Sequence, residues 1–249
     1  MKPEQRETMN RHPIVDDHSN NERQSHHRRS AFITPLVVYL ISFIGPAIVM
    51  GIPTAIGWSN VYLFSHLYVV GTLGQGLMDL PAVVMFARTH VDGKWRGRTR
   101  DHVISIGAGL ACAAVLAGTK IALSGQLVFM DDVPAFTQSL TLAWPWNVIS
   151  ATLAVLAYGP GEAVFVVYLV AAFDTAVSNQ RPLFSWGVVI TALLWGLPHI
   201  ANIFFFGWSA LTNALFMVVV GSALGLLFKG TRSSLGSMVF WTLVNGTTA

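Results

Sequence analysis

The stretch that decides the fold is Tyr158–Phe165, which reads YGPGEAVF and sets one carboxylate beside a break in an apolar run. Gly159 and Gly161 weaken a helix, and Pro160 lacks the N–H that a helix interior needs. Proline does suit the first turn of a helix. We therefore predict that one helix ends before this stretch and that a new helix begins at Glu162.

Two interpretations of Glu162 follow from this position. The first turn of a helix offers unpaired N–H groups and the positive end of the helix dipole, and both stabilise a carboxylate. Glu162 can therefore be an ordinary helix-start residue at the membrane interface. It can also be a functional group, because ionisable residues inside apolar bundles are rare and usually have a role. Two other polar positions, His199 and Asn245, favour the second interpretation.

The composition indicates a polytopic membrane protein. Of the 249 residues, 53% are hydrophobic and 11% are charged, and apolar segments long enough to span a bilayer recur along the chain. The formal net charge is +3, but the basic residues gather in the N-terminal region and in one short loop. We interpret them as topology signals, so we predict the lipid bilayer and no nucleic acid as a partner. The single cysteine, Cys112, has no partner for an intramolecular disulfide.

Apolar runs predict about eight transmembrane helices in one all-α bundle. The runs cover about residues 32–52, 61–87, 102–123, 140–157, 162–174, 184–206, 208–228 and 235–249. Residues 1–31 are polar and mixed in charge, so we predict a disordered tail there and a transmembrane domain over residues 32–249. The tail and Arg88–Asp101 are rich in basic residues, which predicts that both, and hence the N-terminus, are cytoplasmic. In a prokaryote the membrane would be the plasma membrane.

This topology has two consequences. On the count of eight helices, Lys229 and Arg232 fall in an outer loop, against the positive-inside rule. The same count puts the break before Glu162 near the cytoplasmic face of the membrane.

Two further polar side chains are expected at a depth similar to that of Glu162. At 1.5 Å per residue, His199 lies about 22 Å along the helix that starts near residue 184, and Asn245 lies about 15 Å along the last helix. Leaving such groups unpaired in hydrocarbon costs several kcal/mol each. We therefore expect Glu162, His199 and Asn245 to meet.

His66 and Asp79 are ionisable residues of the second span. Such residues are functional candidates, although a hydrogen bond to a neighbouring helix is the commoner explanation, and we place both outside the predicted site. A transporter that uses His66, Asp79 and Glu162 as a polar path is an alternative. The lack of a repeat between the two halves of the sequence argues against it.

The residues around Glu162, His199 and Asn245 resemble motifs of the CPBP family, the CAAX-protease and bacteriocin-processing intramembrane proteases that are also called Abi proteins. In that family a Glu-Glu-x-x-x-Arg motif opens one helix, an aromatic-x-x-x-His motif ends another, and a His-x-x-x-Asn or similar motif lies near the C-terminus. The resemblance covers about residues 140–245, so we take residues 140–249 as the family-like core.

This sequence keeps only part of each motif. Glu162 is followed by Ala163 in place of the second glutamate, and Val167 stands in place of the arginine. Trp195 opens the second motif, where phenylalanine is usual, and Trp241 replaces the histidine of the third. The order and spacing of the three partial motifs are those of the family.

The resemblance implies an integral membrane endopeptidase that cleaves a membrane-associated peptide or protein. Glu162 would activate a water, His199 would assist it and Asn245 would donate to the oxyanion, with Trp195 and Trp241 on the cavity wall. Only Glu162 and His199 remain as strong metal ligands, which argues against a tightly bound Zn²⁺. The sequence does not decide whether the water of such a site is metal-bound, and it identifies no cofactor. The missing residues leave an alternative, a catalytically silent homologue that acts as a membrane binding or immunity-type protein.

Overall fold

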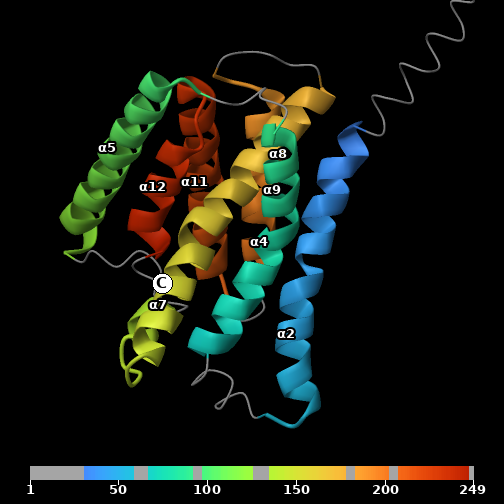
Figure 1. The fold of residues 1–249 in the computed structure, drawn as a ribbon, viewed down its shortest axis with the longest axis vertical. Helices are drawn as coiled ribbons and strands as arrows, with labels where there is room; N and C mark the ends of the chain where they lie inside the picture. Colours follow the sequence, from blue (N-terminus) through green and yellow to red (C-terminus); the bar gives the residue numbers. More distant parts are fainter. Residues whose placement is uncertain are drawn as a thin grey trace, which may run out of the picture.

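The computed structural model describes residues 31–58, 67–91, 97–125, 135–177, 183–201 and 207–246, which form a bundle of helices (Figure 1). The elements are α2 (Ile44–Ala55), α4 (Leu67–Val91), α5 (Thr99–Ser124), α6 (Ala135–Ser139), α7 (Trp146–Leu156), the π-helical turn η1 (Ala157–Gly161), α8 (Glu162–Ala176), α9 (Trp186–Ala201), α11 (Ser209–Thr231), α12 (Leu235–Trp241) and the π-helical turn η2 (Thr242–Gly246). Residues 31–42 are also helical, and no strand occurs in the described ranges. The predicted all-α fold is confirmed. Apart from its last residue, the predicted tail lies outside the described residues.

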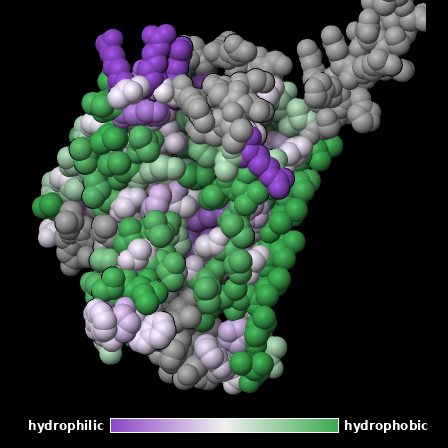
Figure 2. All heavy atoms as spheres, in the orientation of Figure 1, coloured by the Kyte–Doolittle hydropathy of each residue, from purple (hydrophilic) through white to green (hydrophobic). Residues whose placement is uncertain are grey.

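Among the described residues, five helical segments are long and apolar enough to cross a membrane. They are Ala31–Pro53, Val70–Thr89, Thr99–Ala122, Trp146–Ala176 and Leu211–Thr231, and α9 is a shorter apolar helix beside them. Figure 2 shows apolar side chains over most of the visible face, with strongly polar ones gathered toward the end where α5 begins. Many of the exposed side chains are leucine, isoleucine and valine, which suits contact with lipid. The chain is therefore an integral membrane protein of the predicted polytopic class.

The helix break predicted at Gly159-Pro160-Gly161 does not occur. Instead, α7, η1 and α8 form one continuous span of 31 residues, Trp146–Ala176. The helices predicted at 140–157 and 162–174 are thus a single helix. A π-helical turn widens the hydrogen-bond ladder at the point where proline cannot donate, so the helix passes the proline without ending.

The two glycines of this turn allow neighbouring helices to come close. A Cβ on Gly159 would lie 2.9 Å from Cα of Thr242 in η2, and a Cβ on Gly161 would lie 2.7 Å from Oδ2 of Asp79 in α4. Both distances are shorter than real Cβ contacts. The glycines therefore allow close helix packing. They are needed for contacts with distant parts of the chain and do not end the helix.

Merging two predicted helices into one reverses the direction of every later helix. The turn after α11 lies beside the start of α5: Nδ1 of His102 is 2.8 Å from Oγ of Ser233, and a Cβ on Gly97 would lie 3.0 Å from the carbonyl oxygen of Arg232. Lys229 and Arg232 are therefore at the same end of the bundle as the basic start of α5. Their predicted position on the opposite side was wrong, and the exception to the positive-inside rule disappears.

The central helix of the bundle is α8. Its side chains are buried almost all round, including Phe165 and Phe173, and α4, α9, α11 and α12 pack against it. Near its last turn, Asp174 pairs with Lys229 of α11 at 2.5 Å and accepts the backbone N–H of Gly187 in α9 at 2.9 Å. These contacts set the register of α8 against α9 and α11.

Candidate active site

Glu162 lies near the middle of the membrane-spanning helix Trp146–Ala176. It is sixteen residues after Trp146 and fourteen before Ala176, which correspond to about 24 Å and about 21 Å. Its side chain is only 6% exposed. The predicted location near one membrane face was wrong, because the helix continues through η1 instead of turning back.

Two donors bind the same carboxylate oxygen of Glu162. Nε1 of Trp241, in α12, donates to Oε2, and Nδ2 of Asn245, in η2, donates to it at 3.0 Å. The donors are four residues apart, so one helical face presents both. A buried carboxylate needs such partners, and here they hold it in one orientation.

Asn245 uses both of its amide hydrogens inside the protein. Nδ2 donates to Glu162 and, at 2.9 Å, to the carbonyl oxygen of Tyr158. Both neighbours are acceptors, so the nitrogen of the amide must face them. Oδ1 is buried and has no partner among the described residues. In this arrangement Asn245 has no hydrogen left for the oxyanion, the role that the family resemblance implies.

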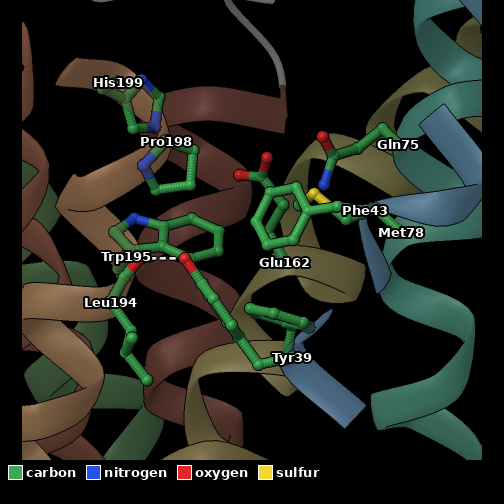
Figure 3. Close-up of a pocket in the computed structure, with 10 residues that line it drawn as sticks. Tyr39, Phe43, Gln75, Met78, Glu162, Leu194, Trp195, Pro198 and His199 are labelled. Atoms are coloured by element: carbon green, nitrogen blue, oxygen red, sulfur yellow. Dashed lines mark hydrogen bonds between the residues drawn. The ribbon is translucent and has the colours of Figure 1, made fainter. Parts of the chain in front are cut away.

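Glu162 and His199 line the same cavity, which has a volume of about 150 Å³ (Figure 3). The register of α8 and α9 explains why both face this cavity, since Asp174 contacts Gly187 near one end of these helices. Glu162 and His199 each lie twelve residues farther from that end, at about 18 Å. The other lining residues are mainly apolar: Tyr39, Phe43, Gln75, Met78, Phe165, Leu194, Trp195 and Pro198.

The two tryptophans predicted on the cavity wall lie in different places. Trp195 lines the cavity, and Figure 3 shows its six-membered ring toward Glu162 and its nitrogen on the side away from it. Among the described residues, those that line the cavity do not include Trp241 or Asn245. Both sit behind the carboxylate that they bind.

Helices near the N-terminus add residues to the site that the three partial motifs do not predict. The hydroxyl of Tyr39 donates to the carbonyl oxygen of Leu194 at 2.8 Å and ties the first span to α9. In α4, Gln75 lines the cavity, and its Nε2 donates to Oδ1 of Asp79 at 3.1 Å. The signal that could have found this pair is two polar residues at a four-residue spacing in a membrane helix.

The side chains at the site do not fit a resident zinc ion. A bound zinc takes at least three protein ligands, and no three His, Cys, Asp or Glu side chains come together in the part of the chain that the structure describes. Oε2 of Glu162 already accepts two hydrogen bonds. His66, the other ionisable residue noted in the second span, lies outside the described residues.

The part of the chain that carries the site matches a known family. Residues 137–247 match the model of the family described as type II CAAX prenyl endopeptidase Rce1-like. This segment is Rce1-like. The match confirms the family that the three partial motifs predicted. No curated protein and no solved structure matches the chain.

In the Rce1-like segment, two positions of the first motif carry apolar residues that pack in the core. Ala163 and Val167 are fully buried on α8, in the hydrophobic core. A charged residue at either position would need a buried partner, so an acid and an arginine are best replaced together. Tyr39 and Gln75 belong to helices before the Rce1-like segment, so the cavity extends beyond the matched residues.

Proposed function

We propose that this protein is an intramembrane endopeptidase of the CAAX protease type, which cleaves a membrane-associated peptide or protein. The observation that supports this most is a buried carboxylate, Glu162, that lines a cavity with His199 near the middle of a membrane-spanning helix. A carboxylate and an imidazole at one depth are suited to general base catalysis of water attack. Ionisable groups within membrane helices are functional candidates by default.

In the proposed reaction, Glu162 accepts a proton from a water held between its carboxylate and His199. The water oxygen attacks the carbonyl carbon of the scissile amide, and the carbonyl oxygen becomes an oxyanion. When the C–N bond breaks, the proton passes from Glu162 to the leaving amine. Trp241 and Asn245 act as positioning residues, because they bind Oε2 and leave the other carboxylate oxygen for the water.

The family description supplies a test substrate, a peptide that ends in a prenylated CAAX sequence. A cavity of about 150 Å³ accepts a side chain or a few waters but not a whole peptide, so the substrate must present an extended segment at its opening. We place the basic end of the bundle, and with it the N-terminus, in the cytoplasm. In a prokaryote the membrane is then the plasma membrane.

Hydrolysis of a quenched fluorescent peptide of this kind, by the full chain in lipid vesicles, tests the proposal. Glu162→Gln and His199→Ala should each abolish cleavage. Leu197→Ala, which changes an exposed side chain of the same helix two residues before His199, is the matched control and should cleave at the wild-type rate. Cleavage by both site variants at the wild-type rate would show that the assignment is wrong.

A second candidate function is a catalytically silent homologue that binds a membrane peptide in the same cavity. It is favoured by the indole of Trp241, which holds Glu162 where the family has a histidine, and by the apolar Ala163 and Val167. Trp241→His discriminates the two functions. A gain of hydrolysis over an inert parent supports the silent homologue, whereas measurable hydrolysis by the parent excludes it.

A further inference from the structure

The proposed reaction needs a hydrogen-bond donor for the oxyanion, and several donor side chains at the site are already engaged or face away from the carboxylate. Asn245 uses both amide hydrogens, and the indole hydrogen of Trp241 goes to Glu162. The hydroxyl of Tyr39 donates to a backbone carbonyl. The nitrogen of Trp195 faces away from the carboxylate (Figure 3). His199 is assigned to the attacking water, so Gln75 is the remaining side chain with an N–H donor among the described residues that line the cavity.

Gln75 has the required chemistry and position. It lines the cavity from α4, and Figure 3 shows its amide end pointing toward the carboxylate of Glu162, on the other side of the cavity from His199. Nε2 donates one hydrogen to Oδ1 of Asp79 at 3.1 Å. The carboxylate is an acceptor, so this contact fixes which end of the amide is the nitrogen. The second hydrogen of Nε2 is then available to a ligand in the cavity.

Asp79 holds this amide and is itself fixed against the helix that carries Glu162. Its side chain is 2% exposed, and Oδ2 has no partner among the described residues. Gly161, the residue before Glu162, makes room for it, since a Cβ there would lie 2.7 Å from Oδ2. The orientation of Gln75 is therefore tied to the turn that sets the direction of Glu162.

We propose that Gln75 is the oxyanion donor of this site and that Asp79 is the residue that positions it. The proposal rests on the proposed function. The N–H of Gln75 donates a hydrogen bond to the carbonyl oxygen as that oxygen gains charge, and no proton moves to it. When the oxyanion collapses, its electron pair re-forms the carbonyl, the C–N bond breaks, and the amine takes the proton from Glu162. The donor thus belongs to a helix outside the Rce1-like segment.

Gln75→Met tests the donor, because methionine keeps the length of the side chain and removes the N–H. With the quenched prenylated peptide, kcat should fall by about 10²-fold to 10³-fold while KM changes by less than about three-fold. Leu80→Met, at an exposed position of α4, is the matched control and should behave as wild type. A kcat for Gln75→Met within about three-fold of wild type would overturn the proposal.

A pair of variants at Asp79 tests positioning. Asparagine keeps a carbonyl oxygen that accepts from Gln75, whereas leucine does not. We expect kcat of Asp79→Asn to exceed that of Asp79→Leu by about ten-fold. In a Gln75→Met background the two substitutions should give equal kcat, because the positioned group is gone. If the two Asp79 variants have equal kcat while Gln75 is present, Asp79 does not position it. A difference between them that persists in the Gln75→Met background would also contradict this role.

A measurement without hydrolysis separates this proposal from the proposed function. In the Glu162→Gln background, a peptidyl ketone with an isotope-labelled carbonyl is bound, and its infrared carbonyl band is recorded. Donation by Gln75 should lower the frequency of the bound carbonyl, and Gln75→Met should remove that shift. If Gln75→Met removes the frequency shift but the wild type hydrolyses no peptide, Gln75 is still a donor to the bound carbonyl and the protease proposal fails. Equal bands in both variants, or no saturable binding, would overturn the donor even in an active enzyme.

Discussion

Trp241→Phe tests whether the indole hydrogen bond stabilises the site and the fold. Phenylalanine keeps the aromatic packing and removes the N–H that donates to Oε2 of Glu162. Trp241 is fully buried, so water cannot take the place of the lost donor. A hydrogen bond to a charged group contributes about 1.5–3 kcal/mol. The smaller ring adds the cost of a cavity, about 1 kcal/mol, so the free energy of unfolding should fall by about 2.5–4 kcal/mol.

Trp195→Phe is the matched control for this change. Trp195 is 5% exposed, and its Nε1 has no partner among the described residues. The substitution therefore removes the same ring volume without breaking a hydrogen bond to Glu162. Because the control also removes a buried donor that has no described partner, the difference between the two variants should be at least about 1.5–3 kcal/mol.

The assay is unfolding of the purified full chain by SDS titration in mixed micelles, followed by circular dichroism. Each variant is compared with wild type under the same detergent conditions, and the slope of the transition is checked for constancy. If Trp241→Phe and Trp195→Phe unfold at the same SDS fraction, the contact between the indole and the carboxylate contributes nothing, and the reasoning fails.

Three further predictions concern the bundle. Asp174→Ala leaves Lys229 buried without its partner and should lower the free energy of unfolding by about 3–5 kcal/mol. A second change, Lys229→Met, should restore most of this loss. An unchanged free energy of unfolding for Asp174→Ala would contradict the prediction. Gly236→Ala brings a Cβ to 2.3 Å from a backbone oxygen of α5 and should lower the melting temperature. The control Gly118→Ala, whose Cβ would have no neighbour within 4 Å, should not lower it. Equal melting temperatures for the two variants would count against the close contact. Single cysteines placed at Arg232 and in the first turn of α5 should react with an impermeant maleimide from the same side of sealed vesicles, and labelling from opposite sides would refute the topology.

The class of the protein and most of its spans could be predicted from the sequence, because each segment that crosses the hydrocarbon must itself be apolar and helical. A long apolar run identifies a membrane helix whatever its neighbours are. Glu162, His199 and Asn245 were found for a related reason, since polar groups inside such runs are rare and costly. The structure puts Asn245 on Glu162 and puts Glu162 and His199 on one cavity. Their catalytic roles remain predictions.

The sequence did not decide whether Gly159-Pro160-Gly161 ends a helix. The local chemistry permits a stop or a π-helical turn, and contacts with Thr242 and Asp79, from distant parts of the chain, select the turn. That selection reverses the direction of all later helices and brings the basic residues to one end. Gln75 escaped notice for the same physical reason: the partner that a polar side chain meets depends on helix register and depth, which only tertiary packing determines.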